Sequence, residues 1–255
     1  MGVIRPPWIS KEWFSKCPFN YCDHFGDKQL LATICKICKD DLKRDEFYKK
    51  SGKDPYDWKN VFEDLADSLA QVHKMIEKDA KRLGIDLNNL PDEEDEAPPH
   101  ESYPIFNLVG KYGDQVERII NGFKEVPTDT DIQLTMKAVD ALSHSRHYIL
   151  AKVGRALSSR WEEQKDPSDD LDDSKTSAFL AYIAIERNSR ALITLSRHKS
   201  LRLSKEKFLR FAKVSLGMCE MIREEFFPQE RLTYEDFGCE EYDKIFDLPN
   251  ISKKL

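Results

Sequence analysis

Apolar side chains recur every three or four residues over five long segments of the chain, which is the spacing of one face of an α-helix. These segments are residues 56–84, 104–124, 130–164, 175–199 and 204–227. No segment alternates apolar and polar residues in the way a half-buried strand does. Because most connections are short, the pattern predicts a mostly α protein built as an antiparallel bundle of about five helices.

The clearest of these helices is predicted over residues 56–84. Its apolar stripe consists of Trp58, Phe62, Leu65, Leu69, Val72, Ile76 and Leu83. Asp54 can accept hydrogen bonds at the start of the helix, and Pro55 suits the first helical position. Gly84 stands where a left-handed residue commonly ends a helix. The sequence therefore marks both ends of this helix.

Two acidic stretches interrupt the helical pattern, one near residues 90–102 and one at residues 166–174. Their charge and proline content predict exposed linkers. Residues 1–54 differ from the rest because cysteines and prolines crowd their first part. We therefore predict a small cysteine-rich region at residues 1–54 and a helical bundle domain at residues 55–255.

The cysteine-rich region contains four of the six cysteines of the chain within 22 residues, spaced Cys-x4-Cys-x12-Cys-x2-Cys, with a histidine between the two pairs. Thiolates in two close pairs are typical ligands of zinc. A ligand set supplied wholly by protein favours a structural zinc ion, with an iron–sulfur cluster as the alternative. The predicted metal-site residues are Cys17, Cys22, Cys35 and Cys38, with His24 as a replacement ligand or as a hydrogen-bond partner of a thiolate.

Two charged residues are predicted to lie on apolar helix faces, Arg146 in the third long helix and Glu186 in the fourth. A charge on an apolar face is costly alone, so we expect these two to pair, with Tyr182 or Arg190 beside them. The pair would be either a buried salt bridge that fixes helix register or part of a pocket for a small anionic ligand.

Asp140, His144 and His147 are neighbours on the polar side of the third long helix, at positions i, i+4 and i+7. Such a trio can bind a metal or transfer protons. The surrounding face is polar, however, which favours a solvated helix surface.

The net charge and the missing motifs argue against several classes of function. The net charge is −6, and acidic residues are interspersed among the basic ones near the N-terminus, which makes nucleic-acid binding unlikely. Neither a membrane-spanning stretch nor a signal peptide is recognisable, so we expect a cytoplasmic protein that does not enter the membrane. No common metalloprotease, nucleotide-binding or nucleophile-elbow motif occurs.

These observations favour a non-enzymatic, partner-binding or regulatory helical protein with a structural zinc site. Its partner would be a protein or a small anionic ligand. The alternative is a ligand-binding protein or an enzyme that uses a polar pocket around Arg146 and Glu186.

Overall fold

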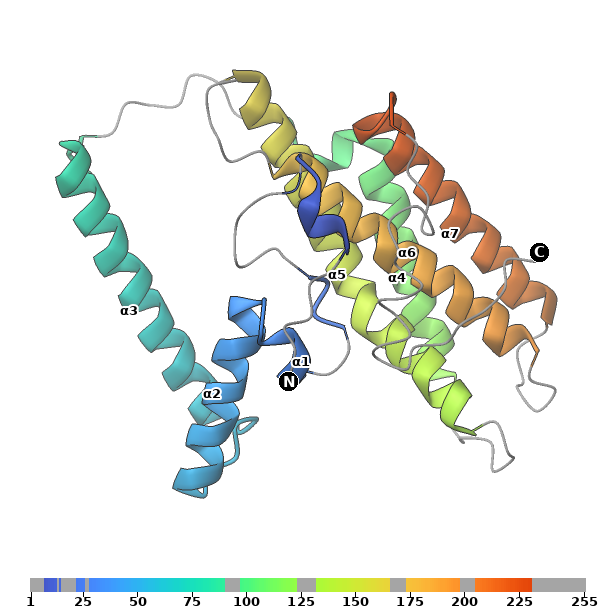
Figure 1. Cartoon of the computed structure of the whole chain (residues 1–255), viewed down its shortest axis with the longest axis horizontal. Coiled ribbons are helices and arrows are strands. Elements are labelled where there is room, and N and C mark those ends of the chain that lie inside the picture. Colours follow the sequence, from blue (N-terminus) through green and yellow to red (C-terminus); the bar gives the residue numbers. More distant parts are fainter. Residues whose placement is uncertain are drawn as a thin grey trace. The chain divides into compact units, whose positions relative to one another are not determined.

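Helices make up nearly all of the part of the chain that the computed structural model describes, which is residues 7–12, 14, 22–25, 28–89, 97–122, 132–165, 173–197 and 205–230 (Figure 1). The α-helices are α1 (Lys28–Leu31), α2 (Lys36–Ser51), α3 (Trp58–Leu83), α4 (Pro104–Asn121), α5 (Ile132–Lys165), α6 (Ser174–Ser196) and α7 (Lys205–Phe226). Two 3-10 helices, η1 (Pro7–Ser10) and η2 (His100–Ser102), complete the described elements. No strand occurs among these residues, and the predicted mostly α fold with antiparallel helices is confirmed over them.

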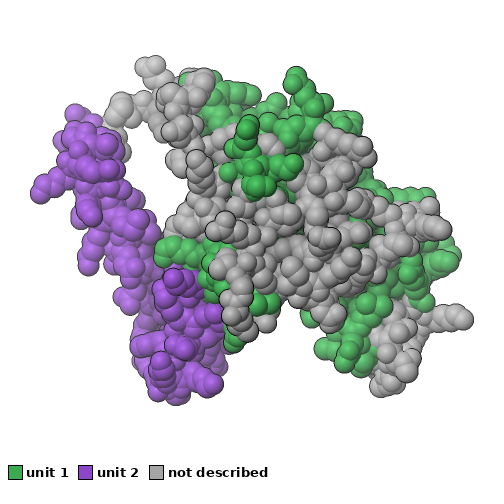
Figure 2. Space-filling model, viewed as in Figure 1, with its two compact units in different colours: residues 1–38, 98–255 green, residues 39–97 purple. Residues whose placement is uncertain are grey.

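The chain forms two compact units, residues 1–38 with 98–255 and residues 39–97 (Figure 2). The first unit holds α4 to α7 together with the described part of the N-terminal segment, and the second holds α3 and most of α2. The helix predicted over residues 56–84 therefore belongs to the second unit and not to the bundle. These limits describe compact packing, whereas the division at residues 1–54 and 55–255 stays a prediction about folding regions.

In the first unit, α4 to α7 form an antiparallel four-helix bundle in which α6 is the most deeply buried helix. α5 and α7 both pack against α6, and α4 packs against α5 and α7. Every residue of α6 except Lys175 is buried, because its sequence offers apolar or small side chains on all sides. Its charged residues Glu186, Arg187 and Arg190 are buried as well, and they need compensating partners inside the protein.

A buried polar layer crosses the bundle and takes one residue from each helix. The Ser215 hydroxyl of α7 donates a hydrogen bond to the Tyr112 hydroxyl of α4 at 2.9 Å. The Ser145 hydroxyl of α5 donates to the Asn188 side-chain oxygen of α6 at 2.6 Å. All four residues are buried. Because these bonds form only when the helices are in the correct axial position, the layer favours one register of the bundle.

The N-terminal segment joins the same hydrophobic core as the bundle. Trp8, Phe14, Phe25 and Leu31 are buried and belong to one cluster with residues of α4 to α7. The Trp8 ring packs edge-on against Phe179 of α6, with 5.6 Å between ring centroids. The cysteine-containing segment is therefore packed on the bundle rather than separate from it.

The second unit is a helical hairpin held by a polar cluster. Asp64 of α3 accepts hydrogen bonds from Tyr48 of α2 at 2.8 Å and from Arg44 at 2.5 Å. The Arg44 guanidinium also donates to the carbonyl oxygen of Pro55 at 2.9 Å. α2 lies beside the N-terminal part of α3, and the rest of α3 extends beyond it (Figure 1).

The two ends of α3 show one prediction confirmed and one wrong. Gly84 adopts a left-handed conformation with φ of 72°, as expected for a residue that ends a helix. The N-cap, however, is Asp57 and not Asp54, because the Asp57 side chain accepts the amide of Lys59. Asp54 instead accepts the amide of Tyr56 in the preceding turn. The acidic stretches predicted near residues 90–102 and 166–174 lie largely outside the described residues.

Candidate metal centre

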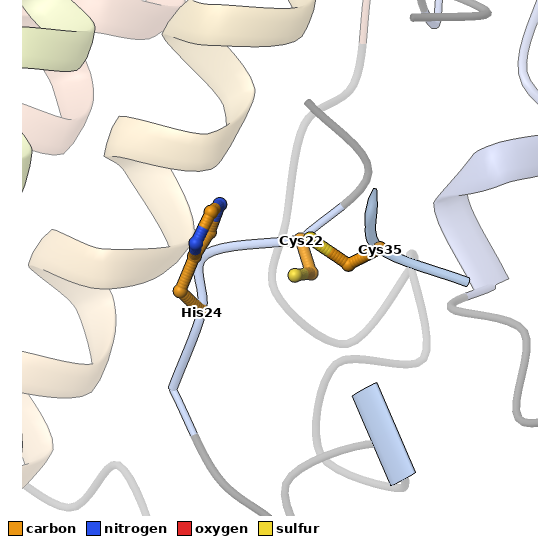
Figure 3. Close-up of side chains that lie close together, drawn as sticks. All are labelled: Cys22, His24 and Cys35. Atoms are coloured by element: carbon orange, nitrogen blue, oxygen red, sulfur yellow. The ribbon is translucent and has the colours of Figure 1, made fainter. Parts of the chain in front are cut away.

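Cys22, His24 and Cys35 bring three potential metal ligands together in the first unit. The Cys22 and Cys35 sulfur atoms and one ring nitrogen of His24 all lie within 4.8 Å of one another. Cys22 and His24 come from one short loop, and Cys35 approaches from the residue before α2 (Figure 3). Among the described residues, this is the one group of three such side chains that could hold an ion.

The chain around α1 and the start of α2 explains why Cys35 and Cys38 share a site. The amide of Cys35 donates to the carbonyl oxygen of Leu31 at 2.8 Å, which closes the turn between the two helices. Cys35 then occupies the position before the first residue of α2, and Cys38 lies in the first turn of that helix. A thiolate in this position is stabilised by the free amide groups of the helix start.

Hydrogen bonding among the cysteines shifts the pKa values of Cys22 and Cys35 in opposite directions. Hydrogen bonds with Cys22 and Cys38, together with the backbone amide of Cys38, lower the pKa of Cys35 far below that of an ordinary thiol. Hydrogen bonds with Cys35 and Cys38, followed by burial, raise the pKa of Cys22. Cys38 is thus a hydrogen-bond partner of both thiols, although its sulfur is not one of the three ligand atoms that lie within 4.8 Å of one another.

His24 is held in an unusual conformation for a residue with a side chain. Its φ is 59°, in the left-handed region, and it is the one described residue other than glycine with positive φ. Such a conformation costs roughly 1–3 kcal/mol and is kept only where the surroundings impose it. Burial lowers the pKa of His24, which favours the neutral imidazole that binds metals.

Asp23, between the two ligands of the loop, attaches this segment to the bundle. Its carboxylate is fully buried and forms an ion pair with Arg187 of α6, which is 5 % exposed. Its backbone carbonyl oxygen accepts a hydrogen bond from His144 Nε2 of α5 at 2.8 Å. The Tyr148 hydroxyl of α5 donates to the carbonyl oxygen of Cys22 at 3.4 Å. The loop that carries Cys22 and His24 is therefore tied to two helices of the bundle.

The Arg187 side chain also contacts Phe25, the last described residue of the same loop. Its guanidinium carbon lies 4.9 Å from the centroid of the Phe25 ring. The His144 ring lies 5.3 Å from the same ring. Charge, hydrogen bonding and aromatic contact thus act on Cys22, Asp23 and Phe25 of the loop.

The remaining residues predicted for the metal site lie at different places. Cys17 lies outside the described residues. Cys219, a cysteine outside the predicted site, is buried, and its thiol donates to the carbonyl oxygen of Tyr182 at 3.8 Å. Asp140, His144 and His147 are exposed on α5, and His144 contacts the metal-site loop through Asp23.

The structure pairs Arg146 and Glu186 differently from the sequence prediction. Arg146 forms an ion pair with Glu117 of α4 at 3.1 Å, and Glu186 forms one with Arg190 on its own helix at 3.7 Å. Arg146 lies at the edge of the buried face of α5, where a side chain on Gly113 of α4 would come within 3.2 Å of its carbonyl oxygen. From there its head group reaches the surface of α4. A shared pocket around Arg146 and Glu186, with Tyr182 and Arg190, stays a prediction.

Asp23 and Arg187 are the functional residues that sequence reasoning missed. Arg187 is adjacent to Glu186, which periodicity placed on the apolar stripe, but the burial of the whole helix leaves no polar side for either residue. The available signal was the position of Asp23 between the two candidate ligands Cys22 and His24.

Comparisons with protein-family models, with curated proteins and with solved structures found no match for this chain. Within the described residues, no helix combines the length and the apolar character needed to cross a membrane. The geometry of the site is therefore the basis for any statement about function.

Proposed function

We propose that this chain is a non-enzymatic helical protein in which a structural zinc ion fastens the N-terminal segment to the bundle. The observation that carries the proposal is the grouping of the Cys22, His24 and Cys35 ligand atoms within 4.8 Å. Cys38, which is hydrogen-bonded to both other thiols, supplies the fourth ligand. Four protein ligands complete a tetrahedral zinc site and leave no position for a substrate.

The ion would contribute stability where the described part of the N-terminal segment has little regular structure of its own. Between η1 and α2, the described residues contain a single four-residue helix. A metal ion that links Cys22 and His24 with the start of α2 would fix this segment in the folded state. Because the ligands are reduced thiols, a reducing compartment such as the cytoplasm suits the proposal.

We assign the protein to the partner-binding class rather than to enzymes. The support is the second unit, in which α3 exposes a continuous row of large apolar side chains. Apolar surface of that extent commonly marks an interaction site. The zinc ion would then have a structural task in the first unit, and association would depend on the second.

Elemental analysis of the purified full-length chain tests the zinc proposal. We expect one zinc ion per chain in the wild type and loss of the ion in Cys35→Ser. Cys219→Ser is the matched control, since it removes a buried thiol outside the cluster, and it should retain zinc. Iron with visible absorbance would support the iron–sulfur alternative instead, and a metal-free protein purified without chelator would refute the site.

A second pair of variants identifies the fourth ligand. If Cys38 completes the site, Cys38→Ser weakens zinc retention in a chelator competition, whereas Cys17→Ser does not. The reverse result would assign Cys17 as the ligand and Cys38 as a hydrogen-bond donor to the site. Cobalt substitution adds an independent readout, because the absorption of tetrahedral cobalt reports how many thiolates bind it.

A further inference from the structure

α3 carries a long apolar face that no described residue covers. Eight large apolar side chains along the helix are between 49 % and 75 % exposed. They are Trp58, Phe62, Leu65, Leu69, Val72, Met75, Ile76 and Leu83. The contacts with α2 use a different side of the helix, through Asn60 and Asp64. Because most helices gain their stability by packing such a face, α3 requires a partner.

The spacing of this face is that of a coiled coil. Apart from Met75, these residues follow one another from Trp58 to Leu83 by alternate steps of four and three residues, with the polar Asp79 in the remaining position of the series. This is a repeat of seven residues, in which a and d positions form the seam between two helices. In heptad notation Phe62, Leu69, Ile76 and Leu83 occupy a, and Trp58, Leu65, Val72 and Asp79 occupy d. A period of 3.5 favours one long, narrow helix-to-helix contact over a broad docking face.

The size of the face fits an interface with a second helix of the same kind. The eight side chains present on the order of 700 Å² of apolar surface, counting aromatic and aliphatic groups at typical areas. A stable interface of standard size buries about 800 Å² per partner. One further copy of α3 would therefore cover the row completely.

The charge along α3 differs between its two halves. The N-terminal half is acidic, through Glu63, Asp64 and Asp67 against Lys59. The C-terminal half is basic, with four basic side chains against two acidic ones: Lys74, Lys78, Lys81 and Arg82 against Glu77 and Asp79. Most of these side chains lie on the outer side of the helix, so they act on a second copy only at long range. Two antiparallel copies would bring the acidic half of one helix nearer the basic half of the other, and would also oppose the two helix dipoles.

The seam itself also favours the antiparallel arrangement. With the middle of the helix as the centre of symmetry, Trp58 meets Leu83, Leu65 meets Ile76, and Leu69 meets Val72 of the other copy. Asp79 then lies opposite Phe62. A parallel pair would instead place the two Asp79 carboxylates against each other in the seam, which is unfavourable.

We propose that α3 forms an antiparallel coiled coil with α3 of a second copy of this chain, so that the protein is a homodimer joined through its second unit. This dimer rests on the partner-binding function proposed above and identifies the partner as a second copy of the chain. It does not depend on zinc, because every residue it uses lies in α3.

Sedimentation of the full-length chain over a wide concentration range tests the proposal. We expect a dimer, and Leu69→Lys should raise its dissociation constant at least about 100-fold, since each dimer loses two buried leucines and would bury two charges. Gln71→Lys is the matched control, because it adds the same charge to the outer side of the same helix. It should leave the dissociation constant nearly unchanged.

Disulfide cross-linking tests the direction. In an antiparallel dimer Leu65 of one copy lies opposite Ile76 of the other, so oxidation should cross-link a mixture of the Leu65→Cys and Ile76→Cys variants but neither variant alone. A parallel dimer would instead cross-link each variant with itself, and that result would overturn the antiparallel arrangement.

The same measurements would also reveal a different occupant of the α3 face. A monomer at every concentration would overturn the proposal. Hydrogen exchange would then show whether α3 is protected by its own chain or open to a different partner. A dimer that tolerates Leu69→Lys would place the interface elsewhere and would equally overturn it. Zinc content, measured on the same samples, reports separately on the metal site, so the two proposals can fail independently.

Discussion

The substitution Arg187→Met removes one partner of the buried ion pair that attaches the metal-site loop to α6. Asp23 is fully buried and Arg187 is 5 % exposed, so water cannot replace the lost partner without a rearrangement. Methionine keeps much of the volume of the arginine side chain and fills the space with apolar atoms. The change therefore isolates the charge of Arg187 with little change in packing.

The expected loss of stability is large because a carboxylate is left buried without its counter-ion. Removing one partner of a buried ion pair costs about 3–5 kcal/mol. The contact between the guanidinium and the Phe25 ring is lost as well, and such contacts contribute about 0.5–2 kcal/mol, part of which overlaps with the first figure. Asp23 retains the amide of Phe25 at 3.4 Å, which compensates for only a small part. We expect the free energy of unfolding to fall by about 4 kcal/mol.

The double variant Asp23→Asn with Arg187→Met separates charge from packing. It removes both charges, so most of the loss should be recovered, leaving about 1–2 kcal/mol for the hydrogen bonds and the ring contact. Arg223→Met is the control at the surface, where the pair with Glu220 is exposed and contributes at most about 1 kcal/mol.

Urea denaturation followed by far-ultraviolet circular dichroism, with zinc present, measures all four free energies. A loss below about 1 kcal/mol in Arg187→Met, equal to that of the surface control, would refute the buried pair. A double variant as unstable as the single one would show that packing, and not charge, explains the loss.

Two further predictions concern glycines and pH. Gly217→Ala should stabilise the protein by about 0.5–1 kcal/mol in the same denaturation assay, since nothing lies within 4 Å of the added carbon. Gly113→Ala should destabilise it by about 1–3 kcal/mol, because the added carbon would lie 3.2 Å from the Arg146 carbonyl oxygen. Burial favours the neutral form of Asp64, but hydrogen bonds from Tyr48 and Arg44 outweigh it and lower the pKa of Asp64. Its contribution to stability should be fully present above the ordinary carboxyl pKa and should disappear as the pH falls through the lowered value. Thermal unfolding of wild type and Asp64→Asn should therefore converge in strong acid, and an unchanged difference between them would contradict the assignment.

Most helices could be predicted from the sequence because their apolar spacing is long and regular. The segment predicted over residues 175–199, for example, is α6 at Ser174–Ser196. Periodicity gives the type of element, but not which face meets which neighbour. Arg146 shows the difference, since a small rotation of α5 moves it from the centre of the buried face to its edge, where Glu117 is the available partner. The N-cap of α3 is a second feature that periodicity does not determine, because Asp54 and Asp57 both suit the position and only the preceding turn decides between them.

The grouping of Cys22, His24 and Cys35 could be predicted because these candidate ligands are close in sequence and chemically distinctive. Cys38 contacts Cys35 through its thiol and its backbone amide, but its sulfur lies outside that group. Asp23 and Arg187 are 164 positions apart and are of common types, so no local pattern connects them. Long-range pairs of ordinary residues become visible only when the fold brings their segments together.

Helix α6 and the loop that carries the candidate metal ligands are best understood as one thermodynamic unit. α6 is buried on every side, yet it carries Arg187, a charge that would be very costly in an apolar core without a partner. Asp23 supplies that partner, but it lies between Cys22 and His24, on a loop with no regular structure of its own. An ion bound by Cys22, His24 and Cys35 would hold the loop in place and so keep the carboxylate on Arg187. Loss of the ion would release the loop, and Arg187 would then remain buried in the bundle without its counter-ion. Zinc removal should therefore weaken α6 and its neighbours, and not only the N-terminal segment that binds the metal.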